Sequence, residues 1–379
     1  MERLLRFPDE LELLRGSTRH FLERECAPRY AEWEDAGVVP REVWLKAGEL
    51  GLLCPAAPEE YGGAGQSFLA STVIQEEITG LTLDCLGFPL HSDIVAPYIV
   101  AFGTDDQKRR WLPKMARGEL IGALAITEPD GGSDVAALRT RAERRGDHFT
   151  ITGSKCFISN GQLADLVIVA ARSTGEGGHS GLSLFVVETA DLPGFRRGRN
   201  LRKLGAHAQD TSELFFEDMR VPAADLLGQE GGGFRMLMQQ LAQERLLMAI
   251  RSVAAAETAL RLTTEYVKQR RAFGRSVFEF QNTRFELAAM RTELLLNRTF
   301  VDHCTQLHCE QKLDAVHAAM AKYAASEMQF SLMDRCLQLH GGWGYMAEMP
   351  IARLWADSRV FRIAGGTTEI MKEVIGRSL

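Results

Sequence analysis

Glu244 is the residue whose surroundings in the sequence best fit a chemical role. In a helix, the residues three, four and seven positions away share its face, and most of them are apolar: Leu237, Gln240, Leu241, Leu247, Met248 and Arg251. Burial among apolar side chains raises the pKa of a carboxyl group, because burial penalises the charged form. A general base that works near neutral pH needs such a pKa. The alternative is a solvent-exposed glutamate, or one paired with Arg245 or Arg251.

A polar turn and a strand form the second candidate region. The turn, AITEPDGGSD at 125–134, carries Thr127 and Ser133 around a backbone that Pro129 and two glycines constrain. The strand, GSKCFISN at 153–160, carries Phe157 and Ser159 in an alternating pattern. By residue type alone, the turn could be an ordinary polar turn, and an aromatic residue in such a strand belongs to a core more often than to a site.

Basic and glycine-rich segments follow in the C-terminal part of the chain. Arg270, in RRAFG at 270–274, has the planar guanidinium group that suits phosphate oxygens. A solvated helix end is the alternative, and it is the preferred interpretation for Lys268, Arg271 and Arg275. In QLHGG at 338–342 the glycines permit close backbone approach. Near the C-terminus, TTE at 367–369 begins a helix whose N-terminal amides favour a phosphate or a ring carbonyl.

Metal binding is not expected. Two His-Cys pairs stand at 303–304 and 308–309. Their five-residue offset places them on different faces of one helix, and no second ligand-bearing segment accompanies them. Ordinary helix packing explains them better. The seven cysteines are odd in number and scattered, so we interpret them as free thiols in a reducing compartment.

The composition is that of a globular protein with more than one packed subregion. The chain has 379 residues, of which 45% are hydrophobic and 25% are charged. A net charge of −6 argues against nucleic acid and anionic membrane surfaces as partners. The N-terminal segment has neither a signal-peptide nor a transit-peptide pattern, and no apolar run is long enough to span a membrane. These features predict a cytoplasmic protein.

The elements that must position these residues follow the order helices, sheet, helices. Helical periodicity runs from Pro8 to about Leu120, alternating and β-branched runs occupy 121 to about 228, and long helical patterns return through 229–379. We therefore predict three domains, at 1–120, 121–228 and 229–379, and an α+β fold that is mainly α. Strands are not interleaved with helices, which argues against a doubly wound sheet, and no Gly-x-Gly-x-x-Gly motif joins a strand to a helix, so a Rossmann site is not supported.

Four segments together resemble the acyl-CoA dehydrogenase family over nearly the whole chain. They are AITEPDGGSD at 125–134, GSKCFISN at 153–160, LAQERLL at 241–247 and IAGGTTEI at 363–370. The C-terminal part is most similar to the long-chain branch. Most of the family has a catalytic glutamate at the position of Gly365, whereas Glu244 stands where the long-chain and isovaleryl branches have theirs. Ala364 and Asp93 depart from the family pattern, so the acyl chain stays open.

The resemblance implies an N-terminal helical domain, a central β-barrel and a C-terminal four-helix bundle, with FAD between barrel and bundle. It implies that Glu244 removes the α-proton of an acyl-CoA and that the Gly365 amide stabilises the enolate, together with a flavin ribityl hydroxyl. The implied flavin contacts are Leu124, Ile126, Thr127, Gly132, Ser133, Phe157, Ser159, Arg270, Phe273, Phe280, Gln281, Gln338, Gly341, Gly342, Thr367 and Glu369. The implied substrate contacts are Ser133, Arg245, Gly366 and Arg377.

The family also implies a homotetramer, built as a dimer of dimers, in which Arg270 and its neighbours reach the FAD of another subunit. Electrons would pass to an electron-transfer flavoprotein. Two alternatives stay open. One is an oxidase-like enzyme that passes electrons to oxygen, and the other is an inactive paralogue that serves as an assembly partner.

Overall fold

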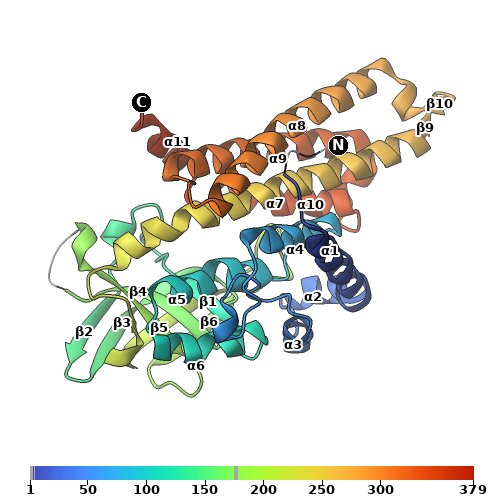
Figure 1. Ribbon diagram of the computed structural model, residues 1–379. Coiled ribbons are helices and arrows are strands. Elements are labelled where there is room, and N and C mark those ends of the chain that lie inside the picture. Colours follow the sequence, from blue (N-terminus) through green and yellow to red (C-terminus); the bar gives the residue numbers. More distant parts are fainter. Residues whose placement is uncertain (1–2, 4, 175–177) are drawn as a thin grey trace.

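The computed structural model describes residues 3, 5–174 and 178–379, and it confirms the predicted order of helices, sheet and helices (Figure 1). The predicted α+β class with a mainly helical content is also confirmed. Within the described residues, each helix is too short or too polar to cross a lipid bilayer.

The N-terminal region is made of short helices joined by tight turns. Thr104 illustrates how the sequence fixes them, because its side chain accepts a hydrogen bond from the Gln107 amide while the Gln107 side chain bonds back to the Thr104 amide. A π-helical segment, η4 (Leu90–Val95), leads directly into α5. The α-helices are α1 (Asp9–Phe21), α2 (Tyr30–Ala36), α3 (Arg41–Glu49), α4 (Phe68–Gly80), α5 (Ala96–Phe102) and α6 (Asp105–Ala116).

A mostly antiparallel sheet forms the centre of the chain. Its hydrogen-bonded order is β6-β7-β3-β2-β4-β5-β8, and β1 pairs in parallel with β4. Residues 166–171 of β4 and 182–187 of β5 are buried on both faces, and all of them except Ser183 are apolar. The strands are β1 (Gly122–Ala125), β2 (Arg141–Arg145), β3 (His148–Ser159), β4 (Leu166–Arg172), β5 (Leu182–Glu188), β6 (Phe195–Asn200), β7 (Thr211–Pro222) and β8 (Leu226–Leu227).

The expected closed β-barrel is wrong, since the sheet is open. Among the described strands, the two edges, β6 and β8, do not pair with each other. Their own sequences explain this. Strand β8 has only two residues, and β6 carries the charged side chains of Arg196, Arg197 and Arg199, which oppose edge-to-edge pairing.

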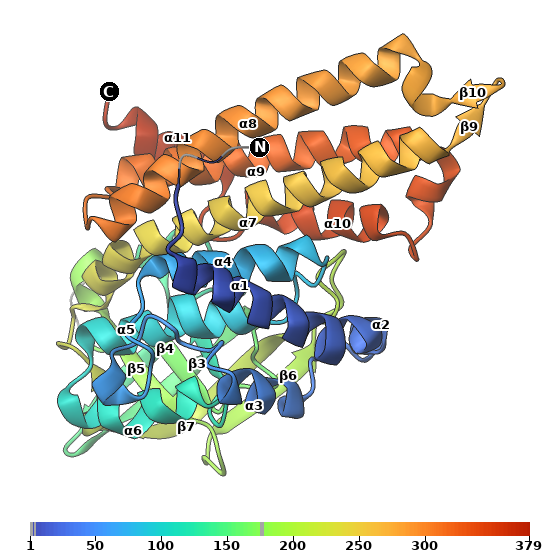
Figure 2. The same ribbon diagram turned by 45° about the vertical axis from the view of Figure 1, so that its right-hand side comes forward.

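The C-terminal region is a bundle of long helices that lies across the sheet domain (Figures 1 and 2). Helix α7 crosses from the sheet to a small hairpin at the far end of the bundle, α8 returns beside it, and α9 runs again toward the hairpin end, where Tyr266 of α7 bonds the His340 carbonyl oxygen. The helices are α7 (Gly233–Gln269), α8 (Gln281–Cys309), α9 (Ala315–His340), α10 (Pro350–Ser358) and α11 (Thr368–Gly376), and the hairpin is β9 (Arg271–Ala272) with β10 (Arg275–Ser276).

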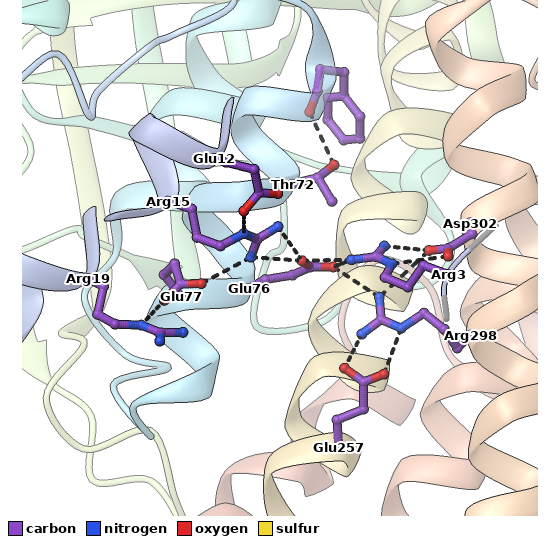
Figure 3. A network of polar contacts seen from close by, with 11 residues as sticks. Arg3, Glu12, Arg15, Arg19, Thr72, Glu76, Glu77, Glu257, Arg298 and Asp302 are labelled. Carbon is purple, nitrogen blue, oxygen red and sulfur yellow. Dashed lines mark hydrogen bonds and ion pairs between the residues drawn. The ribbon is translucent and has the colours of Figure 1, made fainter. Parts of the chain in front are cut away.

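An ion-pair network ties the N-terminal helices to the bundle (Figure 3). Arg3 Nη1 donates to Glu76 of α4 at 2.7 Å, and Arg3 Nη2 donates to Asp302 of α8 at 2.5 Å. Buried Arg298 of α8 bonds both Glu76, at 3.0 Å, and Glu257 of α7, at 2.6 Å. Ion pairs therefore connect four segments that are far apart in the sequence: the N-terminal segment, α4, α7 and α8.

A continuous apolar core joins α5, the sheet and the first part of α7. Tyr98 of α5, Leu184 of β5, and Leu237 and Leu247 of α7 all belong to it. Glu244 lies on α7 between those two leucines, so three parts of the fold meet around it.

Candidate active site

Glu244 is buried at the interface of α7 and α5. Its side chain is 7% exposed, so the solvent-exposed alternative is wrong. The Tyr98 hydroxyl donates a hydrogen bond to Glu244 Oε1 at 2.9 Å. Burial raises the pKa of Glu244 to about 7, opposed first by the Tyr98 hydrogen bond and then by the charge of Arg245. The carboxyl group can therefore give and take a proton near neutral pH.

The two arginines that could have paired with Glu244 bond elsewhere. Arg245 Nε donates to the Gly365 carbonyl oxygen at 3.3 Å, and Arg251 Nη2 donates to the Asp84 carbonyl oxygen at 2.6 Å. Arg245 thus links the helix that bears Glu244 to the segment around Gly365.

Gly365 lies against the turn of α7 that follows Glu244. A Cβ atom on Gly365 would be 2.8 Å from Met248 Sδ, and the glycine has φ +65°. Gly366 follows with φ +99°, and its carbonyl oxygen accepts a hydrogen bond at 2.7 Å from Nζ of Lys322, a buried residue of α9. The structure thus brings Glu244, Arg245, Gly365 and Gly366 together, as the sequence predicted, and adds Lys322.

The turn at 125–134 is held against strand β3. The Cys156 amide donates to the Thr127 carbonyl oxygen at 2.9 Å, and Lys155 Nζ donates to the Ile126 carbonyl oxygen at 2.8 Å. Leu124 lies in strand β1, which leads into this turn, while Gly132 and Ser133 lie in the exposed part of the turn. The two predicted segments, 125–134 and 153–160, are therefore neighbours in space.

A buried ion pair that sequence reasoning missed supports this turn. Lys155 Nζ lies 2.9 Å from Glu128 Oε1, and the Glu128 carboxylate also accepts hydrogen bonds from the Arg139 and Thr140 amides. Burial lowers the pKa of Lys155 to about 8, although the charge of Glu128 opposes this. The signal available in the sequence was a lysine at an inward position of an alternating strand.

Phe157 is exposed rather than part of the core. The register of β3 against β7 shifts between Lys155 and Ile158, and Phe157 has φ +60° within that irregularity. As a result, 68% of the Phe157 surface is accessible, while Ser159 pairs with Thr211 in the regular ladder. The bulge therefore presents an aromatic ring on the surface beside the Thr127 turn.

A second group of predicted residues gathers at the far end of the bundle. Arg270, Gln338, Gly341 and Gly342 line one cavity of about 510 Å³. Near it, Phe273 in the β9–β10 hairpin is 95% exposed, and its ring centroid lies 6.2 Å from that of Phe280, which immediately precedes Gln281 and α8.

The two groups are well separated within one chain. Helix α7 continues from Glu244 to Gln269 before Arg270 is reached, which is roughly 39 Å at 1.5 Å per residue. Figure 2 shows the β9–β10 hairpin at the opposite end of α7 from the sheet. A single protomer does not bring Glu244 and Arg270 to one place.

The remaining predicted residues lie on or near α11, which packs on α9. The Thr367 hydroxyl caps this helix by accepting from the Ile370 amide, and Glu369 lies in its first turn. Arg377 follows the last turn, is exposed and bonds Glu373 at 2.7 Å, so the structure does not bring it to Glu244. Among the described residues, no three His, Cys, Asp or Glu side chains are arranged to hold a metal ion.

Comparison with known proteins gives matches along nearly the whole chain. Residues 8–119, 123–219 and 231–379 match the N-terminal, middle and C-terminal domains of acyl-CoA dehydrogenase. The long-chain specific acyl-CoA dehydrogenase of Mus musculus, a mitochondrial protein, is 49% identical over 375 residues, which cover 98% of this chain and 87% of that protein.

Solved structures show the same fold. An acyl-CoA dehydrogenase from Geobacillus kaustophilus superposes with a TM-score of 0.96 at 48% identity, covering 100% of this chain and 99% of the other. A glutaryl-CoA dehydrogenase from Mycobacterium smegmatis in complex with FADH2 has a TM-score of 0.90 at 28% identity, covering 98% and 95% of the two chains. The chain therefore belongs to the acyl-CoA dehydrogenase family.

Proposed function

We propose that this protein catalyses the FAD-dependent α,β-dehydrogenation of an acyl-CoA thioester to the trans-2-enoyl-CoA, with Glu244 as the base. The observation that carries the proposal is the buried Glu244 carboxyl group, whose pKa is about 7, beside the Gly365 segment. The proposed domains are 1–120, 121–228 and 229–379.

The residues divide the chemistry between them. An α-C–H bond of a thioester is a weak acid, so a free carboxylate alone does not remove its proton at a useful rate. In the proposed arrangement Glu244 accepts the α-proton while the Gly365 N–H donates to the thioester carbonyl oxygen, where negative charge develops. Arg245 and Lys322 hold the carbonyls of Gly365 and Gly366 and so fix the direction of this backbone. FAD, when bound, accepts the hydride from the β-carbon.

The described residues fit a flavin. The exposed Phe157 ring offers a face for stacking beside the turn that carries Thr127 and Ser133. At the other end of α7, Gly341 and Gly342 have open space where a side chain would be, in the cavity that Arg270 lines. We assign the phosphates to Arg270 and the adenine side to Gln338, Gly341 and Gly342. The FADH2 in the Mycobacterium smegmatis relative supports FAD as the cofactor.

The remaining assignments are made by residue. The other flavin contacts proposed are Leu124, Ile126, Gly132, Ser159, Phe273, Phe280, Gln281, Thr367 and Glu369. The proposed contacts of the CoA ester are Ser133, Arg245, Gly366 and Arg377, of which Arg377 has the least support because it lies at the exposed end of α11.

The separation along α7 supports a site shared between subunits. Because Arg270 and Glu244 lie roughly 39 Å apart on one helix, Arg270 of one protomer would reach the flavin of another. We propose a homotetramer, as a dimer of dimers, with an electron-transfer flavoprotein as electron acceptor. The exposed Phe273 ring and the half-buried Phe280 ring would lie at the subunit contact. The predicted cytoplasmic location is a proposal that cell fractionation can test, and the relative from Mus musculus is mitochondrial.

The proposed function is tested with Glu244→Gln in the FAD-loaded protein. We expect the variant to bind flavin but to show no anaerobic flavin bleaching when acyl-CoA is added. The matched control is Glu265→Gln, which changes an exposed glutamate of the same helix that pairs only with Arg261 among the described residues. Bleaching at an undiminished rate in Glu244→Gln would refute the role of Glu244.

The acyl group is identified with a panel of straight, branched and aromatic acyl-CoAs, compared by their rates of flavin reduction. Peroxide formation when substrate is added would reveal that the enzyme passes electrons to oxygen.

A further inference from the structure

Tyr98 is the one residue that the structure shows bonded to the Glu244 carboxyl group within the described part of the chain. Its hydroxyl donates to Oε1 at 2.9 Å, and its side chain is fully buried. We propose that Tyr98 is a positioning residue that orients the carboxylate and sets the pH range over which Glu244 accepts the α-proton. This inference rests on the proposed function and names a residue beyond the family motifs.

The geometry restrains both partners. Tyr98 lies on α5, which packs against α7, and its ring contacts Phe102 with centroids 6.3 Å apart. A fully buried ring in this core has no space to turn away from Glu244. Because the hydroxyl bonds Oε1, we assign Oε2, which accepts no hydrogen bond among the described residues, as the oxygen that takes the α-proton. The hydrogen bond would thereby set which oxygen is turned toward the substrate.

The hydrogen bond also opposes the effect of burial on the charge. A donor to a carboxylate favours its ionised form, and burial disfavours that form. Arg245 acts in the same direction as Tyr98. Among the described residues, two further titratable groups lie close to the sequence neighbours of Glu244. They are Asp93 of η4, whose carbonyl oxygen accepts from Gln243 at 2.7 Å, and Lys322 of α9, whose pKa is lowered first by burial and then by the charge of Arg245.

Replacement of the hydroxyl has a definite expected effect. Tyr98→Phe keeps the ring and removes the donor, so Glu244 should hold its proton to higher pH. Loss of a hydrogen bond to a charged group corresponds to a shift of about one pH unit, or about a tenfold loss of rate on the acidic limb. At high pH, where Glu244 is ionised in both proteins, only the lost orientation of the carboxylate lowers the rate, so the loss there should be smaller than the loss on the acidic limb.

The experiment follows α-proton removal separately from hydride transfer. FAD-loaded protein is mixed anaerobically with acyl-CoA from about pH 5.5 to about pH 9.5, and the flavin reduction rate is recorded. The probe for proton removal is a 3-thia-acyl-CoA, which has sulfur in place of the β-carbon and cannot give a hydride. Exchange of its α-protons with D₂O reports Glu244 alone. The matched control is Tyr30→Phe, because Tyr30 is also buried. In the described structure its hydroxyl oxygen accepts one hydrogen bond, from the Cys85 backbone N–H.

Each outcome decides the proposal. An alkaline shift in Tyr98→Phe, together with an unchanged profile in Tyr30→Phe, supports it. An unchanged midpoint, or an equal loss of rate at every pH, overturns it. Should Tyr98→Phe bind no FAD, a fluorinated tyrosine at position 98 provides a stronger donor and an expected shift to lower pH, and no shift there counts against the role. Failure of the proposed function would look different, because Glu244→Gln itself would then retain bleaching.

Discussion

Met248 occupies the space into which a side chain at Gly365 would extend. A Cβ atom on Gly365 would lie 2.8 Å from Met248 Sδ and 3.1 Å from Met248 Cε, and φ at Gly365 is +65°. Met248 is one helical turn beyond Glu244 on α7. The packing of the Gly365 segment against α7 therefore suits a site with one base, Glu244.

This packing predicts that the base cannot simply be moved back. In a Glu244→Gln background, we expect Gly365→Glu to restore little flavin reduction by acyl-CoA, because φ of +65° strains any side chain there and the end of Met248 must shift to admit one. Adding Met248→Ala makes that shift unnecessary but leaves the backbone strain, so it should raise the reduction rate only in part. Met248→Ala alone serves as the control and should keep most of its activity. Full activity in Glu244→Gln/Gly365→Glu with Met248 intact would contradict the prediction.

The raised pKa of Glu244 makes its contribution to stability depend on pH. The folded-state pKa of about 7 lies above the ordinary value of 4.5, so the folded protein binds this proton more tightly than the unfolded chain does. Stability from this group is present below about pH 4.5 and is lost as pH rises to about 7. The free energy of unfolding of Glu244→Gln, relative to that of the wild type, should therefore increase by about 1–3 kcal/mol between pH 5 and pH 8. Urea unfolding at each pH measures this difference. A difference that does not change with pH would show that Glu244 is not buried in solution.

The Lys155–Glu128 pair should be costly to break on one side only. Lys155→Met leaves the Glu128 carboxylate buried without its cation, and we expect a loss of about 3 kcal/mol in the free energy of unfolding. Lys155→Met/Glu128→Gln should recover part of this loss. Because the pair supports the turn that carries Thr127, the single variant should also bind FAD less well. Equal stability of the single and double variants would exclude coupling between the two charges.

The network in Figure 3 predicts a similar effect at Arg298. This guanidinium is 3% exposed and bonds both Glu76 and Glu257, so Arg298→Met should lower the free energy of unfolding by about 3 kcal/mol. The matched control is Arg261→Met, whose pair with Glu265 is more than half exposed and should matter by less than about 1 kcal/mol. Chemical denaturation measures both. Similar losses in the two variants would mean that burial of the network contributes nothing.

Arg270 should matter for flavin retention rather than for folding. Arg270→Ala removes the guanidinium from the cavity that also contains Gln338, Gly341 and Gly342, so we expect a lower ratio of flavin to protein absorbance after purification. Arg271→Ala is the control, because Arg271 is exposed and bonds only the Gly274 carbonyl oxygen in the described structure. An unchanged ratio in Arg270→Ala would remove this residue from the proposed FAD site.

Local sequence patterns determined the order of elements and the burial of Glu244. Periodicity depends on residues a few positions apart, so the change from helical spacing to alternation near residue 121, and back near residue 229, could be read directly. The apolar neighbours of Glu244 on one helical face likewise predicted its buried position. Closure of the sheet could not be read in this way, because it depends on whether β6 meets β8.

Only the tertiary structure decided which groups surround the candidate base. Tyr98 and Glu244 are 146 positions apart in the sequence, and Lys322 and Gly366 are 44 apart. No spacing within a single element relates such residues, since their contact depends on how α5, α7 and α9 pack. The outward position of Phe157 likewise followed from a bulge against β7. A sequence fixes which face of an element each side chain takes, and packing between elements then decides what that face meets.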